Sequence, residues 1–269
     1  MAANPYTTNL ELQLDARDIV GLSDGDSVET WEDSSAAGND VTQSTSGRRP
    51  VYKTNIIGSN PVVRFSASST KSLYATFASS WSGFSGVTVF SLCQFIETST
   101  QDYPGFLVLH GGSGNDYNNA NNLLIGGGTS NNYILQGRNS LYFAHNSTNY
   151  DAPFGGMVVG KPSLFGLAYR TGSDGLKAIS EYGAYTTGYT GYYAGTPTSL
   201  LIGNRYLGAI STSGGFRFDI ALMLIYKEYM SDSNISDVVD WILDEFDLHT
   251  QAAAGGGMMR NPGMSGGLI

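Results

Sequence analysis

Cysteine, charge and long apolar runs are all scarce in this sequence of 269 residues. The one cysteine, Cys93, excludes an internal disulfide, and its apolar surroundings in VTVFSLCQF predict a buried thiol. Charged residues make up 14% of the chain, against roughly 25% in an average soluble domain. No apolar stretch reaches the roughly 20 residues of a transmembrane helix, so we expect no membrane-spanning segment.

Positive charge is especially scarce. The chain has 14 Lys and Arg against 23 Asp and Glu, which gives a formal net charge of −9. Proteins that bind nucleic acids or anionic membranes need a basic patch, and Arg48-Arg49 is too small to provide one. We therefore expect no nucleic acid and no membrane among the partners. The first residues, MAANPYTTNLELQLD, lack the basic and apolar parts of a secretory signal, so we expect synthesis in the cytoplasm.

Glycine and tyrosine, by contrast, are abundant, with 35 and 17 copies. Short strand-like runs recur between clusters of Gly, Asn, Asp and Ser. In one of them Leu10, Leu12 and Leu14 alternate with polar residues, which is the period of a half-buried strand. Many short strands separated by turns predict an all-β sandwich rather than alternating strands and helices.

One segment near the end of the chain has helical periodicity instead. In SDSNISDVVDWILDEFDL, the apolar residues that fall on one helical face are Ile235, Val238, Val239, Ile242, Leu243 and Phe246. Ser231 is a suitable N-cap. Asp244, Glu245 and Asp247 gather at the other end, where the helix dipole disfavours negative charge. They form either a solvated acidic face or a surface to which a partner supplies basic groups.

Two parts of the sequence carry a recognisable pattern. The first contains LDA at Leu14–Ala16, GDSVETWEDSS at Gly25–Ser35, GND at Gly38–Asp40, RPVY at Arg49–Tyr52 and NPVVRF at Asn60–Phe65. The second is FDIALMLIYKEYMSDSNISDVVDWIL, which suits a strand followed by a short helix. These motifs resemble laminin-G-like domains of the concanavalin A-like lectin/glucanase superfamily, and they bracket residues 10–248.

The resemblance implies an all-β fold, a two-sheet antiparallel jelly-roll sandwich with one short C-terminal helix. Trp31 and Phe65, which are large residues among small polar neighbours, suit a core between two sheets. The expected organisation is an N-terminal arm over residues 1–9, the jelly-roll domain over residues 10–250 and a flexible, extended Gly/Met-rich arm over residues 251–269. Domains of this kind bind sugars, bind proteins or act as structural modules, so the fold does not decide the function.

Catalytic and metal-binding motifs are sparse. The glucanase branch of the superfamily carries Glu-x-Asp-x-x-Glu on a strand, and no strand-like run in this sequence contains that motif. His110, His145 and His249 show no metal-ligand spacing. SDGDS at Ser23–Ser27 predicts a turn, with a calcium site as the alternative. We expect no enzyme activity and no cofactor, apart from that calcium alternative.

Two loop segments contain the candidate ligand-binding residues. GGSGNDYNNANN is rich in Asn and Asp, which favour turns, and its alternative role is a polar binding loop that uses Tyr117 and Asn118. EYGAYTTGYTGYY clusters tyrosines that either pack on a sheet or present an adaptable contact surface. In this second segment, Tyr189 and Tyr192 are the candidate sugar-stacking residues.

The chain ends in AAAGGGMMRNPGMSGGLI, where the composition changes abruptly to Ala, Gly and Met. A purely solvating linker would avoid apolar side chains, and methionine adapts well to grooves on a partner. We therefore expect this arm to bind another subunit. The residues proposed for that contact are Met258, Met259, Arg260, Met264, Leu268 and Ile269.

The sequence leaves three functions open. The first hypothesis is a non-enzymatic structural protein of a bacteriophage virion, such as a capsid decoration protein or a head or tail fibre component, present as a homo-oligomer or in many copies. Its partners would be other virion proteins, bound through the C-terminal arm, and glycans of the host surface. The second hypothesis is a soluble carbohydrate-binding module, and the third is a divergent glycoside hydrolase.

Overall fold

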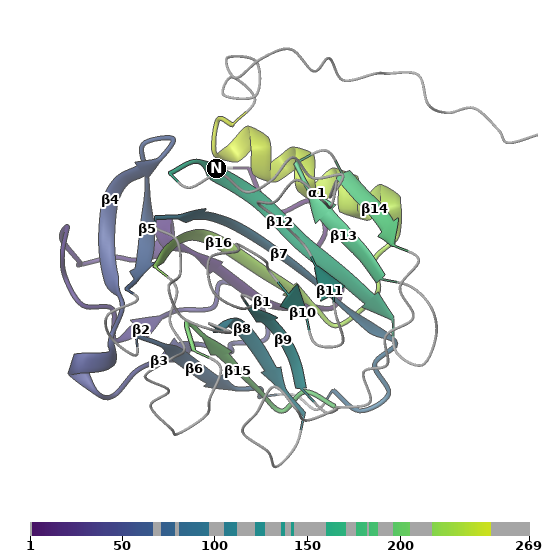
Figure 1. The fold of residues 1–269 in the computed structure, drawn as a ribbon, viewed down its shortest axis with the longest axis horizontal. Coiled ribbons are helices and arrows are strands. Elements are labelled where there is room, and N and C mark those ends of the chain that lie inside the picture. Colours follow the sequence, from purple (N-terminus) through teal and green to yellow (C-terminus); the bar gives the residue numbers. More distant parts are fainter. Residues whose placement is uncertain are drawn as a thin grey trace, which may run out of the picture.

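The computed structural model describes residues 2–66, 71–78, 81–96, 105–111, 122–126, 136–137, 141–142, 160–170, 176–181, 183–187, 196–204 and 217–248. Over these residues the chain forms two antiparallel β-sheets, two short 3-10 helices and one α-helix (Figure 1). This arrangement confirms the predicted all-β sandwich with a C-terminal helix. No helix in the described part has the length and apolar content needed to cross a bilayer.

Sheet A is arranged around β16 (Phe218–Tyr226). The order of its strands is β14 (Gly183–Thr187), β13 (Leu176–Ser180), β12 (Pro162–Arg170), β7 (Gly86–Phe95), β16, β5 (Asn60–Phe65) and β4 (Val51–Ile57). A further strand, β1 (Leu10–Asp15), pairs with residues 222–226 of β16, while β5 pairs with residues 218–220. β16 therefore joins the first and last parts of the described sequence.

Sheet B covers one face of sheet A. The order of its strands is β11 (Leu141–Tyr142), β10 (Gln136–Gly137), β9 (Asn122–Gly126), β8 (Gly105–His110), β15 (Ser199–Ile202), β6 (Leu73–Thr76), β3 (Val41–Thr42) and β2 (Thr30–Trp31). Among the described strands, β2 forms one edge of this sheet.

The main hydrophobic core lies between the two sheets. Trp31 and Phe65, which were predicted there, are each 1% exposed. Phe65 stacks on Phe218 of β16, with ring centroids 4.9 Å apart. Cys93 also lies in this core, and its burial raises the pKa of the thiol. The positions of Trp31, Phe65 and Cys93 confirm the sequence predictions.

Two β-bulges decide which side chains face this core. The sequence predicts Leu10, Leu12 and Leu14 on one face of β1. Leu12 and Leu14 lie between the sheets, but Leu10 packs on the opposite side, because the pairing with β16 shifts between Leu10 and Leu12. β16 has a similar shift opposite β7, between Ile220 and Leu222. An extra residue in one strand reverses which side chains face the core. The prediction from periodicity that Leu10 shares a face with Leu12 and Leu14 is therefore wrong.

The helix α1 (Asp232–Glu245) forms a third layer on the outer face of sheet A (Figure 1). The apolar face predicted from the sequence is buried against that sheet. The Ser231 side chain caps the helix by accepting a hydrogen bond from the backbone N–H of Asn234, as predicted. The β4–β5 turn closes against the other end: Gly58 has a φ of +54°, and a Cβ there would lie 2.6 Å from the carbonyl oxygen of Phe246.

A buried ion pair connects β5 to β16. Asp219 is fully buried, and its carboxylate accepts hydrogen bonds from Nε and Nη2 of Arg64 at 2.7 and 2.8 Å. The two residues lie opposite each other in the strand register. Burial raises the pKa of Asp219, and the hydrogen bonds from Arg64 oppose that rise. Without Arg64, the buried carboxylate would lose the hydrogen bonds that offset most of the cost of its burial.

We predict that Arg64→Met lowers the free energy of unfolding by about 3–5 kcal/mol at neutral pH, because it leaves the Asp219 carboxylate buried without its partner. The loss should shrink as the pH falls: burial already raises the pKa of Asp219, and without Arg64 it rises further, so protonation stabilises the folded variant more than the folded wild type. Urea denaturation at about pH 7 and about pH 5 measures both effects.

The matched control for this experiment is Lys71→Met, which removes a cation whose Nζ donates to the backbone carbonyl of Gly47 at the surface and which is not among the charges that act on Asp219. No buried carboxylate loses its partner in this variant. We expect a small loss of stability that is equal at both pH values. A loss for Arg64→Met that does not change with pH would contradict the account of Asp219.

Candidate functional site

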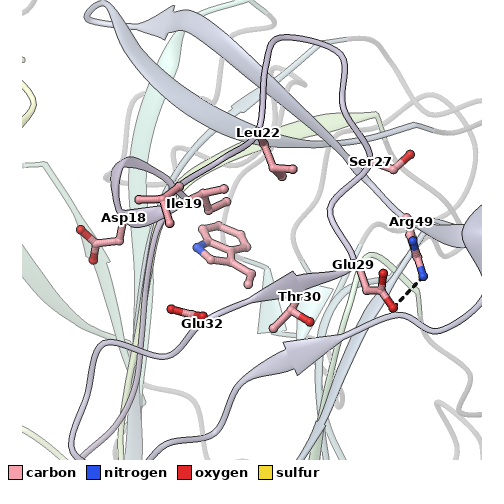
Figure 2. A pocket seen from close by; sticks show the side chains of 10 residues that line it. Asp18, Ile19, Leu22, Ser27, Glu29, Thr30, Glu32 and Arg49 are labelled. Carbon is pink, nitrogen blue, oxygen red and sulfur yellow. Dashed lines mark ion pairs between the residues drawn. The ribbon is translucent and has the colours of Figure 1, made fainter.

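A pocket opens beside β2, at the edge of sheet B (Figure 2). Its volume is about 340 Å³, near the lower end of the roughly 300–1,000 Å³ that ligand pockets occupy. Its lining comes from the segment that follows β1, from β2 with its flanking residues, and from Arg49 just before β4. The lining therefore combines segments of both sheets, because β2 is an edge strand of sheet B while β1 and β4 belong to sheet A.

The apolar part of the pocket comes mainly from the segment after β1. Ile19, Val20 and Leu22 line it, together with the indole of Trp31. Val20 is 86% exposed, whereas Trp31 is almost fully buried. An apolar side chain that stays exposed beside a cavity is available for contact with a ligand rather than with the core.

Polar side chains make up the rest of the lining. They are the hydroxyls of Ser27 and Thr30, the carboxylates of Asp18, Glu29 and Glu32, and the guanidinium of Arg49. Arg49 Nη2 pairs with Glu29 Oε1 at 2.8 Å, and the guanidinium also donates to the backbone carbonyls of Gln43 and Ser44. Asp18 and Glu32 lie on one side of the pocket, and Glu29 with Arg49 on the other (Figure 2).

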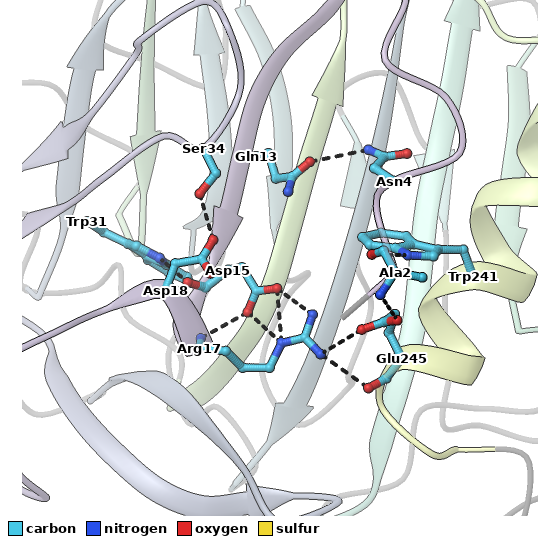
Figure 3. Close-up of polar contacts among 10 residues, drawn as sticks. All are labelled: Ala2, Asn4, Gln13, Asp15, Arg17, Asp18, Trp31, Ser34, Trp241 and Glu245. Atoms are coloured by element: carbon cyan, nitrogen blue, oxygen red, sulfur yellow. Dashed lines mark hydrogen bonds and ion pairs between the residues drawn. The ribbon is translucent and has the colours of Figure 1, made fainter.

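A hydrogen-bonded junction behind the pocket, which we call the Asp15–Arg17 junction, holds Trp31 in place (Figure 3). The indole N–H of Trp31 donates to the backbone carbonyl of Asp15 at 3.1 Å. The Asp15 carboxylate accepts hydrogen bonds from the guanidinium of Arg17, the shortest at 2.6 Å. Arg17 also donates to the backbone carbonyl of Glu245 at 3.2 Å and lies over the ring of Phe246, with Cζ 4.0 Å from its centroid.

This junction is largely shielded from water. The side chain of Asp15 is 4% exposed and that of Arg17 is 11% exposed. Burial opposes the charge on Arg17, but the contacts with Asp15 and Glu245 outweigh burial and raise the pKa of the guanidinium. A basic group of the same chain, Arg17, therefore meets Glu245 at the acidic end of α1.

The segment at residues 2–9, predicted as an N-terminal arm, is tied to the same region. The backbone N–H of Ala2 donates to Glu245 Oε1 at 2.6 Å, and the Trp241 indole donates to the carbonyl of Ala2 at 3.1 Å (Figure 3). Asn4 Nδ2 donates to Gln13 Oε1 and to the hydroxyl of Tyr226. These contacts hold the segment against α1 and the outer side of sheet A.

The loop after β2 is fixed by Asp33. Its carboxylate accepts hydrogen bonds from the backbone N–H groups of Gln13, Ser35 and Asn39 and from the Ser35 hydroxyl. The Asn39 side chain in turn donates to the carbonyl of Glu11 and accepts from the backbone of Ala78. The WEDSS and GND motifs therefore connect β1 to sheet B, and through this loop they set the position of the pocket edge.

The predicted turn at Ser23–Ser27 is confirmed. The Asp26 N–H donates to the carbonyl of Ser23, and the Asp26 carboxylate accepts from the N–H of Ser23 at 2.7 Å. The Asp24 carboxylate accepts from Lys53 and from the backbone of Thr54. Both carboxylates are thus used by the chain itself. Over the described ranges, no three His, Cys, Asp or Glu side chains come together in a way that could hold a metal ion.

The binding residues predicted from the sequence lie outside the described residues, so their placement stays a prediction. They are Tyr117, Asn118, Tyr189 and Tyr192 for a ligand, and Met258, Met259, Arg260, Met264, Leu268 and Ile269 for a partner. The pocket was not predicted from the sequence, because the segments Gly25–Ser35 and Arg49–Tyr52 were interpreted only as motifs of the fold. One signal was present: Ile19, Val20 and Leu22 form an apolar group without strand or helix periodicity.

The comparisons with known proteins give a result only at the level of structure. No protein-family model matches the sequence, and a search of curated proteins finds no match. The solved binding domain of botulinum neurotoxin serotype D has 12% identity and a TM-score of 0.53, over 87% of this chain and 51% of that one. The binding domain of serotype G has 11% identity and a TM-score of 0.53, over 87% and 51%.

A third similar structure is the Trypanosoma rangeli sialidase in complex with sialic acid. It has 13% identity and a TM-score of 0.50, over 88% of this chain and 33% of the sialidase. The fold is a two-sheet antiparallel β-sandwich. This chain spans about half the length of the neurotoxin binding domains and about one third of the sialidase, and at such low identity the similarity describes the sandwich alone.

Proposed function

We propose that this protein is a non-catalytic, lectin-like recognition module that binds carbohydrate in the pocket beside β2. The observation that supports this function is the mixed lining of the pocket, in which hydroxyl, carboxylate and guanidinium groups surround an apolar wall with the exposed Val20. Sugars present both hydroxyl groups and apolar C–H faces, so a concave site with a few placed polar groups suits them. The fixed Arg49 and the buried junction behind Trp31 reduce the entropy lost on binding.

The similar structures agree with a recognition role without assigning one. The neurotoxin domains are named as binding domains, and the sialidase was solved with a sugar ligand. Those ligands belong to those proteins, because the same fold hosts many functions. The non-catalytic part of the proposal rests on the sequence, which lacks the strand motif Glu-x-Asp-x-x-Glu of the glucanase branch.

The setting we propose for this module is a virion, with residues 251–269 as the anchor. The support is the composition of that arm, in which Met258, Met259, Leu268 and Ile269 stand among glycines. Apolar side chains on a backbone rich in glycine suit docking along the surface of another subunit. Display in many copies would also strengthen a weak sugar contact through avidity.

We predict that Thr30→Trp abolishes binding on a glycan array, because Thr30 is exposed in β2 and lines the pocket, so a large ring there fills the cavity. The fold should persist, since an exposed strand position accepts an aromatic residue. Thr76→Trp is the matched control, because Thr76 is an exposed threonine of the same sheet that does not line the pocket. Full binding by Thr30→Trp would show that the pocket is not the site.

We also predict that deletion of residues 252–269 leaves the sandwich folded but prevents incorporation into virions, because the arm lies outside the described core and supplies the anchor. Quantitative mass spectrometry of purified particles measures the copy number of the full-length and shortened proteins. A melting curve of the isolated shortened protein controls for folding. Normal incorporation of the shortened protein, or particles that lack the full-length protein, would contradict the virion setting.

A further inference from the structure

The pocket beside β2 carries an excess of negative charge. Among the described residues that line it are three carboxylates, of Asp18, Glu29 and Glu32, and one cation, Arg49. The charge of Arg49 is already paired with Glu29 at 2.8 Å. Hydrogen bonds to two backbone carbonyls hold the same guanidinium in place. Arg49 is therefore a poor partner for the carboxylate of an acidic ligand.

Among the described residues, the other two carboxylates, Asp18 and Glu32, have no cationic partner. Asp18 Oδ2 accepts a hydrogen bond from the Ser34 hydroxyl at 2.7 Å, and within the described part of the chain neither Asp18 nor Glu32 forms an ion pair. Both residues are exposed and lie on the same side of the pocket (Figure 2). The net charge of −9 on the whole chain adds to the negative potential at this site.

We infer that this pocket selects a sugar with a free, protonated amino group and rejects acidic sugars, an inference that rests on the proposed carbohydrate-binding function. An ammonium group beside Asp18 and Glu32 would form charge-assisted hydrogen bonds, which are stronger than those of a neutral hydroxyl. A ligand carboxylate would be repelled by the same groups, and repulsion of the wrong ligand is a common source of specificity. Sialic acid, the ligand of the similar sialidase structure, is acidic and therefore unsuited to this pocket.

The apolar wall and the Arg49–Glu29 pair complete the site for such a sugar. Val20 and its apolar neighbours would contact the C–H face of the ring. The Arg49–Glu29 pair, on the opposite side from Asp18 and Glu32, offers a donor and an acceptor to ring hydroxyls (Figure 2). Charge selects the amino group, while shape and hydrogen bonds would hold the rest of the ring.

Calorimetric titration of the full chain with matched probes tests this inference. The probes are an oligomer of glucosamine, its N-acetylated counterpart, which has the same rings without the charge, and an oligomer of a uronic acid. The titration is run at about pH 5.5, because the sugar amine is less basic than an α-amino group and is protonated only below neutral pH. We expect the glucosamine oligomer to bind at least about tenfold more tightly than the N-acetylated one, and the uronic acid oligomer not to bind.

Charge-neutralising variants connect the selectivity to the pocket. Glu32→Gln keeps the shape of the side chain and should weaken binding of the glucosamine oligomer by about three- to tenfold, and binding of the N-acetylated oligomer by clearly less. Asp237→Asn, which removes the same charge from an exposed position in α1, should change neither affinity. Added salt should weaken binding of the glucosamine oligomer alone.

The outcomes separate this inference from the proposed function. Equal binding of the two glucosamine forms, or tighter binding of the uronic acid oligomer, would overturn the charge selection and leave carbohydrate binding standing. If the folded wild-type protein bound none of the sugar probes, both the inference and the proposed function would fail. Binding of a lysine-rich peptide in place of every sugar probe would likewise overturn both.

Discussion

The Asp15–Arg17 junction is the contact on which the candidate site depends. Through its backbone carbonyl, Asp15 at the end of β1 holds the indole of Trp31 at the edge of sheet B. Through its guanidinium, Arg17 reaches the carbonyl of Glu245 at the end of α1. Sheet A, sheet B and the helix therefore meet at one buried pair of opposite charges. Because both side chains are nearly excluded from water, removal of Arg17 would take away the hydrogen bonds that compensate the buried charge of Asp15.

The place and the rigidity of the pocket follow from this junction. The segment that supplies Asp18, Ile19 and Val20 begins directly after Arg17, so its first residues are fixed by the same hydrogen bonds that hold Trp31. A site that is already ordered loses little entropy when a ligand binds. The β-sandwich thus acts as a scaffold, and the specificity we propose arises from a few charged residues at its edge.

Local patterns predicted much of this fold, and long-range contacts account for most of what they missed. Helical periodicity and a good cap predicted α1, and size against a polar background predicted Trp31 in the core. Leu10 was placed wrongly because a bulge leaves no trace in a periodic pattern. The contact of Arg17 with Glu245 joins residues 228 positions apart, and the pocket lining comes from several separate segments. The first has no local signal in the sequence, and the only signal for the second was the apolar group of Ile19, Val20 and Leu22.

Nuclear magnetic resonance of the three tryptophan indoles would test ligand binding at this pocket most directly. Trp31 lines the pocket, Trp81 lies in the core and Trp241 lies on α1, so each indole N–H reports on a different region. On titration with the glucosamine oligomer, the Trp31 resonance should shift saturably while those of Trp81 and Trp241 stay in place. A Trp31 resonance that does not move at saturating oligomer, or a shift confined to Trp241, would contradict the account.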